Sequence, residues 1–206
     1  MLWLPLRRIM ETEAPNISIH SAPIHGNAEE LLLSASIDLA VHYYIGSHPQ
    51  IRTSWLFSNK LVCVIRSDHR LLQTLDSKGV LPLEQYLLED NLIVSLSGEA
   101  RANVDDRLAQ QGLKRKIAMA VNHFSLIPSI LKESNLVCVT PQSVVASSVH
   151  AGELTVVPLP FNIEPAPISL LWHARQDRDE GNIWMRQHIS RFANIKTAKI
   201  DGWFSE

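Results

Sequence analysis

Three short apolar runs constrain the fold of this chain more than any other feature. They read IDLAV from Ile37, LVCVI from Leu61 and LVCVT from Leu136, and their aliphatic and β-branched residues are typical of buried strands. Segments with apolar residues at helical spacing lie between them, including residues 100–111 and 124–132. Strands that alternate with helices favour right-handed strand–helix–strand units, so we predict an α/β protein with mostly parallel sheets.

The pattern of elements occurs in two similar rounds. The first round is predicted to contain helices at 4–13 and 27–36 and strands at 17–21, 37–41, 53–57 and 61–65. After a polar stretch, the second is predicted to contain helices at 83–88, 100–111, 124–132 and after Pro141, with strands at 91–95, 116–121, 136–140 and 154–157. A proline-rich stretch, 158–167, then leads to a terminal strand and a terminal helix.

Composition limits what the chain can bind. Its formal net charge is -2 and it has no run of five or more basic residues, so the chain as it stands is not expected to hold DNA. Cys63 and Cys138 lie within apolar runs and are expected to be core thiols rather than a disulfide. The sequence contains no apolar stretch long enough for a membrane span and no signal peptide, which predicts a cytoplasmic protein.

The most distinctive motif is ISLLWHARQDRDEGNIWMR, residues 168–186. It resembles the last strand and last helix of the effector-binding domain of LysR-type transcriptional regulators, in the LeuO-, NodD- and NahR-like branch. The matching positions are Trp172, His173, Arg175, Asp179, Gly181, Trp184 and Arg186. Two positions depart from that pattern: Glu180 stands in place of proline and Met185 in place of leucine.

The resemblance covers nearly the whole chain, since IDLAV, LVCVIRSDHRL and LVCVTPQ also match, with Arg70 in place of a proline. It implies a two-lobed, periplasmic-binding-protein-like (type II) fold. Lobe one would comprise residues 1–60 and 161–206, and lobe two residues 61–160. In this family a winged helix-turn-helix, a linker helix and the first strand of lobe one precede the position at which this chain starts. We therefore expect no DNA-binding domain here, and a gap near the middle of the lobe-one sheet.

Ligands of such folds are expected at the carboxyl ends of strands, next to helix N-termini. In lobe two, Ser95, Ser97 and Gly98 follow a strand, and their hydroxyls and amides suit a carboxylate or phenolate. A serine there can equally be a helix cap. His123 and Phe124 match family positions that line the pocket; the alternative is an ordinary cap and an ordinary core residue.

Lobe one supplies the opposite wall of the expected cleft. Tyr43 and Tyr44 follow the IDLAV strand, and one of the two is expected to be structural. His25 and Asn27 precede a helix at the matching end of the preceding strand. Trp172 lies on the returning strand and is expected to pack in the core.

The sequence lacks the motifs of common enzymes. SLSGEA has no glycine two positions before its serine, no His-Glu-x-x-His pair occurs, and no glycine-rich phosphate loop is present. We therefore predict that the chain is not an enzyme and that it needs no metal or other cofactor.

The resemblance implies a sensory domain. A small aromatic or organic acid would bind between the lobes and favour their closure, in a homodimer or homotetramer that contacts DNA only through the absent helix-turn-helix domain. Three alternatives stay open: a stand-alone small-molecule-binding protein, an enzyme on the same scaffold, and a truncated subunit that only pairs with full-length relatives.

Overall fold

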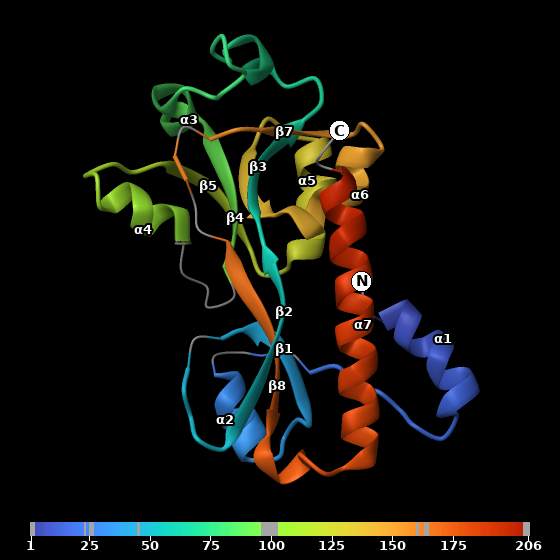
Figure 1. Cartoon of the computed structure of the whole chain (residues 1–206). Helices are drawn as coiled ribbons and strands as arrows, with labels where there is room; N and C mark the ends of the chain where they lie inside the picture. Colours follow the sequence, from blue (N-terminus) through green and yellow to red (C-terminus); the bar gives the residue numbers. More distant parts are fainter. Residues whose placement is uncertain are drawn as a thin grey trace. The chain divides into compact units, whose positions relative to one another are not determined.

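The protein divides into two compact units. The computed structural model describes residues 3–22, 24, 27–44, 46–95, 103–159, 161–162 and 165–203. The first unit comprises Met1–Ser58 with Ala166–Glu206, and the second comprises Asn59–Pro165 (Figure 1). Each unit contains one β-sheet with helices on both of its faces.

The first unit is built on a three-stranded sheet in the order β1-β8-β2. Strand β1 pairs with β8 antiparallel, so that Leu39 lies opposite Trp172 and Tyr43 opposite Ile168. The elements of this unit are α1 (Trp3–Glu13), α2 (Ala28–Leu33), β1 (Leu39–Tyr43), β2 (Ile51–Asn59), β8 (Ala166–His173), the 3-10 helix η3 (Ala174–Gln176) and α7 (Glu180–Trp203).

Alternation along β8 gives this unit two cores. Leu170 packs with Leu6 of α1 and Ile189 of α7, whereas its neighbour Leu171 packs with Leu32 of α2. Successive side chains of a strand point to opposite faces of the sheet. Helices α1 and α7 therefore lie on one face of the sheet and α2 on the other (Figure 1).

The second unit is built on a five-stranded sheet in the order β5-β4-β6-β3-β7. Strand β4 is parallel to β5 and β6, and β3 is antiparallel to β6 and β7. The elements are β3 (Leu61–Arg66), η1 (Arg70–Gln73), α3 (Leu83–Leu88), β4 (Asp90–Val94), α4 (Asn103–Ala109), β5 (Lys116–Val121), η2 (Phe124–Leu126), α5 (Ile127–Lys132), β6 (Val137–Pro141), α6 (Gln142–His150) and β7 (Leu154–Val157).

The two cysteines belong to cores on opposite faces of this sheet. Cys63 packs with α3 and α4, and Cys138 packs with α5 and α6. The sheet between them keeps the two sulfur atoms from bonding. Burial raises the pKa of the Cys138 thiol to about 12, so this thiol stays protonated and behaves as a small apolar core residue.

The α/β architecture is as predicted, but the sheets are mixed rather than mostly parallel. Parallel pairing requires a crossover connection. Strand β3 follows β2 after Lys60 alone, so no helix intervenes to turn the chain round, and β3 pairs antiparallel with both of its neighbours.

The predicted strand at 17–21 is wrong. These residues have no regular structure, and Ile17 and Ile19 are 40% and 36% exposed. A strand needs a neighbour for its backbone N–H and C=O groups, and no described strand runs beside this segment. The expected gap near the middle of the first sheet is also absent from its described strands, because β1, β8 and β2 are consecutive neighbours and β1 is an edge strand.

Candidate functional site

Two groups of predicted site residues meet at the carboxyl ends of parallel strands in the second unit. Val94 at the end of β4 lies opposite Val121 at the end of β5, and the Ser95 backbone N–H donates to the Val121 carbonyl at 2.9 Å. His123 and Phe124 follow Val121 by two and three residues. The structure therefore brings Ser95, His123 and Phe124 to the same edge of the sheet.

Two of these residues can be compared with their alternative roles as an ordinary cap and an ordinary core residue. The His123 side chain makes no capping hydrogen bond to η2. Phe124 is 39% exposed and so is not an ordinary core residue. A hydroxyl, an imidazole and an aromatic ring can together bind a small molecule that is both flat and polar.

Thr140 is a further candidate that the sequence reasoning missed. It lies near the end of β6, the second parallel neighbour of β4. The side chain is 1% exposed, and its hydroxyl oxygen has no hydrogen-bond partner among the described residues. The signal in the sequence was a polar residue just before Pro141, at the end of an otherwise apolar strand.

The two adjacent tyrosines of the first unit have different roles. The Tyr44 hydroxyl donates to Glu29 Oε2 at 2.6 Å and accepts from the His48 backbone N–H at 3.4 Å. Burial, and secondarily the hydrogen bond to Glu29, raise the pKa of Tyr44. A Cβ atom at Gly46 would lie 2.5 Å from the Tyr44 ring, so only glycine fits beside it. Tyr44 is therefore the structural tyrosine.

Tyr43 remains a candidate for ligand contact. It ends β1, its side chain is 45% exposed, and its hydroxyl has no hydrogen-bond partner in the part of the chain that the structure describes. Asn27, by contrast, is the N-cap of α2, and its side-chain oxygen accepts from the Glu29 backbone N–H at 2.9 Å. His25, Ser97 and Gly98 lie outside the described residues.

The distinctive tail motif forms a structural corner rather than a pocket. The Trp172 indole N–H donates to Asp177 at 2.7 Å, and the Arg186 guanidinium lies 4.2 Å from the centre of the Trp172 ring. The Asp179 side chain accepts from the Asn182 backbone N–H at 2.7 Å and so caps α7. These contacts fix the turn between β8 and α7.

Arg175 and His173 complete this corner. The Arg175 guanidinium donates to the carbonyl oxygens of Leu32 at 2.7 Å and Leu33 at 3.3 Å, which end α2. His173 Nδ1 accepts from the Arg175 backbone N–H at 2.9 Å. Burial, and next the nearby Arg175 charge, lower the pKa of His173, so its imidazole is neutral near pH 7.

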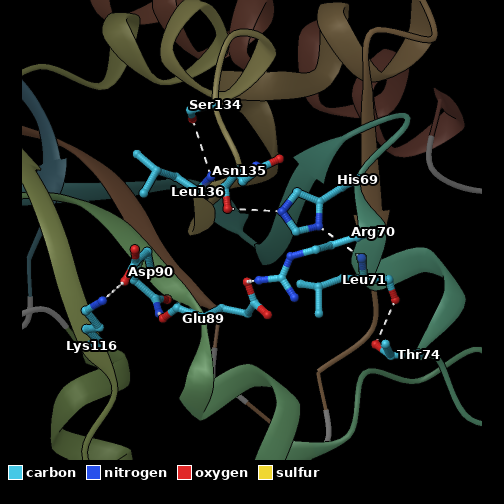
Figure 2. Close-up of polar contacts among 11 residues, drawn as sticks. His69, Arg70, Leu71, Thr74, Glu89, Asp90, Lys116, Ser134, Asn135 and Leu136 are labelled. Atoms are coloured by element: carbon cyan, nitrogen blue, oxygen red, sulfur yellow. Dashed lines mark hydrogen bonds and ion pairs between the residues drawn. The ribbon is translucent and has the colours of Figure 1, made fainter.

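A second polar cluster surrounds η1 in the second unit (Figure 2). Arg70 Nη2 lies 2.6 Å from Glu89 Oε2, and Lys116 Nζ lies 2.6 Å from Asp90 Oδ1. His69 Nδ1 accepts from the Leu71 backbone N–H at 3.1 Å, which leaves its Nε2 to donate to the Asn135 carbonyl at 3.0 Å. Each of these groups is used to hold η1 and β4, so the cluster is structural.

Other kinds of site receive no support from the described residues. Within these ranges, no group of three or more His, Cys, Asp or Glu side chains is arranged to hold a metal ion. Among the described helices, none combines the length and the apolar character needed to span a membrane.

Comparison with known proteins identifies the family. A model described as "LysR substrate binding domain" matches residues 2–193 of this chain. The chain belongs to the LysR substrate-binding domain family. Its sequence is 31% identical to the HTH-type transcriptional activator NagR of Ralstonia sp. over 188 residues, which cover 89% of this chain and 60% of NagR. It is 27% identical to the HTH-type transcriptional activator NahR of Pseudomonas putida, over 88% of this chain and 59% of NahR.

Solved structures agree with this LysR-family assignment. The regulatory domain of MexT, a transcriptional activator in Pseudomonas aeruginosa, matches with a TM-score of 0.75 and 26% sequence identity, over 93% of this chain and 90% of that domain. The chain therefore aligns with most of the length of that regulatory domain. It spans about 60% of the length of the curated relatives NagR and NahR.

Proposed function

We propose that this LysR-family domain binds a small-molecule effector and thereby controls transcription through a helix-turn-helix DNA-binding domain. Family membership and the similarity to two transcriptional activators support this proposal. The effector would favour one of two conformations of the domain, and it would shift their equilibrium only by the difference between its affinities for them.

The observation that carries the proposal is the juxtaposition of Ser95, His123 and Phe124. Their strands are parallel neighbours, and the bond from Ser95 to Val121 holds the two strand ends together at 2.9 Å. Ligands of α/β sheets bind at the carboxyl ends of parallel strands. The His123 side chain makes no capping hydrogen bond, and the Phe124 side chain is 39% exposed. Both side chains are therefore available to contact a ligand.

The chemistry of these groups favours a small aromatic or organic acid. The Phe124 ring offers a face for stacking, and the Ser95 hydroxyl and the His123 imidazole can donate hydrogen bonds to a carboxylate. We assign Ser97 and Gly98 to the same site from their place in the sequence, since they follow Ser95 closely. From the first unit we assign Tyr43, with His25 and the side-chain Nδ2 of Asn27, which the cap of α2 does not use, as secondary contacts.

We further propose that the domain forms a homodimer or homotetramer and acts in the cytoplasm, where its DNA target lies. Strand β5 is the edge of its sheet, and Met119 on it is 42% exposed. Ile17 and Ile19 are similarly exposed in the first unit. A two-fold axis would bring α1 and residues 17–20 of one subunit against α4 and β5 of the other, and would repeat the contact.

The experiment that tests effector binding is a thermal-stability screen of small aromatic and aliphatic carboxylic acids against the domain. A ligand that binds only the folded state raises its unfolding temperature in a concentration-dependent way. His123→Ala and Ser95→Ala should reduce the stabilisation by the best compound. His150→Ala is a matched control, because His150 lies in the last turn of α6.

The outcomes separate the competing functions. Stabilisation that is lost in His123→Ala and kept in His150→Ala supports the assigned site. A compound that stabilises all variants equally binds elsewhere, and the site assignment is then wrong. If no acid stabilises the domain but the domain still self-associates, the result would instead favour a subunit that only pairs with its relatives and binds no effector. Turnover of any compound in the screen would contradict the proposal that the domain is not an enzyme.

A further inference from the structure

A groove lies between α1 and α7 of the first unit. Its residues are distant in the sequence from Ser95, His123 and Phe124. It has a volume of about 600 Å³ and is lined by Leu4, Pro5, Arg8, Ile9 and Phe192. Small-molecule sites commonly enclose about 300 to 1,000 Å³ and have mostly apolar walls with a few polar groups. The groove fits this description, with Arg8 as its charged lining residue.

Contacts between α1 and α7 fix the two walls of this groove. On α1, Leu6 and Met10 point into the core, so that Leu4, Arg8 and Ile9 belong to the neighbouring face of the helix. At the C-terminal end of α1, Glu13 Oε2 accepts from the Trp184 indole N–H at 3.1 Å and lies 3.5 Å from His188 Nε2. The groove is therefore framed by a fixed pair of helices.

Neither acidic residue of α1 pairs with Arg8. Glu11 pairs with Arg7 at 3.3 Å, and Glu13 faces Trp184 and His188. In the described part of the chain, no carboxylate lies against Arg8. The groove also adjoins the first turn of α1, where the helix dipole favours an anion. An apolar trough with an unneutralised cation is complementary to a molecule with a hydrocarbon part and one negative charge.

We propose that this groove is a second ligand site, which binds an amphiphilic carboxylate such as a medium-chain alkanoate. The alkyl chain lies along Leu4, Ile9 and Phe192, and the carboxylate pairs with the Arg8 guanidinium. This site is separate from the effector site proposed above, because all of its lining residues lie on α1 and α7.

Calorimetric titration with octanoate tests the proposal, and octylammonium is the probe of equal chain length and opposite charge. Arg8→Gln should weaken octanoate binding about threefold to tenfold, since it removes a partly exposed charge-assisted contact. Arg7→Gln is the matched control on the same helix and should change the affinity by less than about twofold. Octylammonium should bind more weakly than octanoate, and should gain affinity in Arg8→Gln.

A second pair of variants tests the apolar wall. Leu4 and Leu88 are both 73% exposed, so replacing either by glutamine should leave the fold intact. Leu4→Gln should weaken octanoate about twofold to fivefold because it removes apolar contact area, and Leu88→Gln should have no effect.

Three results would overturn the proposal. The first is no octanoate binding at millimolar concentration, and the second is equal binding by wild type and Arg8→Gln. The third is octanoate binding that falls in His123→Ala but not in Arg8→Gln, which would place the acid at the effector site and leave that proposal standing. If Leu4→Gln alters self-association while octanoate does not bind, a second copy of the chain covers the groove instead.

Discussion

The guanidinium of Arg70 lies 2.6 Å from the Glu89 carboxylate, although the arginine side chain is 63% exposed and the glutamate side chain only 3% (Figure 2). The family pattern that LVCVIRSDHRL resembles has proline at the position of Arg70. The arginine therefore supplies a counter-charge for a buried carboxylate that a proline cannot supply. Because Glu89 precedes β4, this pair fastens η1 to the strand that leads to Ser95.

The first prediction concerns this pair. Arg70→Ala should lower the free energy of unfolding by about 1 to 2 kcal/mol, because the buried Glu89 carboxylate loses a hydrogen bond while solvent reaches the exposed side of the pair. Adding Glu89→Gln should recover part of that loss, since the uncompensated charge is removed. Urea denaturation measures both effects. An Arg70→Ala midpoint equal to that of wild type would show that solvent alone stabilises Glu89.

The second prediction concerns a buried arginine under α4. Arg115 donates to both oxygens of Asp105 at 2.8 Å and to the Tyr86 hydroxyl at 3.0 Å, and its side chain is 1% exposed. Asp105→Ala should cost about 3 to 5 kcal/mol, because it leaves a buried cation without its counter-ion. The exposed residue Gln111, which follows α4, is the control, and Gln111→Ala should change stability by about 0.5 kcal/mol or less. Equal denaturation midpoints for the two variants would contradict the assigned role of Arg115.

The third prediction concerns pH and the corner between β8 and α7. Hydrogen bonding from Trp172, and next from Arg52, lowers the pKa of Asp177 in the folded state. A lowered folded-state pKa means that ionised Asp177 stabilises the fold above its unfolded pKa of roughly 3.9, and that this contribution is lost as the pH falls through the folded value. Asp177→Asn should therefore be less stable than wild type at pH 7, and the difference should shrink towards pH 3. A difference that stays constant between these pH values would show that Asp177 does not titrate as described.

The fourth prediction concerns self-association. If residues 17–20 and β5 form the subunit contact, Ile19→Glu should abolish the dimer in sedimentation equilibrium, because a carboxylate would be buried in an apolar interface. Met119→Glu should have the same effect from the other side of the contact. Leu88→Glu, at another exposed leucine, should leave association unchanged. A dimer as tight in Ile19→Glu as in wild type would remove this interface from consideration.

The sequence predicted those elements whose signals are local. The helix 83–88 and the strands 116–121 and 154–157 have the predicted bounds, and Asn27 caps α2 as its side chain suggests. The strand at 17–21 failed because a strand depends on a neighbour that is distant in the sequence. The mixed sheet was missed for the same kind of reason, since pairing direction is set by how the chain enters the sheet.

Part of the candidate site could also be predicted from local sequence signals. The place of Ser95 and His123 at neighbouring strand ends follows from alternating strands and helices, and the structure adds the hydrogen bond that joins those ends. Tyr43 and Tyr44 were not distinguishable by sequence, because the partner of Tyr44 is Glu29, fifteen residues away. Thr140 was overlooked because a single sequence does not show whether a buried hydroxyl has a hydrogen-bond partner.

The most direct test of the central claim is the dissociation constant of the best carboxylic acid, measured by calorimetry on wild type, His123→Ala and His150→Ala. Binding at the ends of β4 and β5 predicts that His123→Ala weakens the affinity about tenfold or more, because a hydrogen bond to a charged group contributes about 1.5 to 3 kcal/mol. His150→Ala should match wild type within about twofold. Equal dissociation constants for all three proteins would contradict the account, because the acid would then bind without the imidazole that the site is built around.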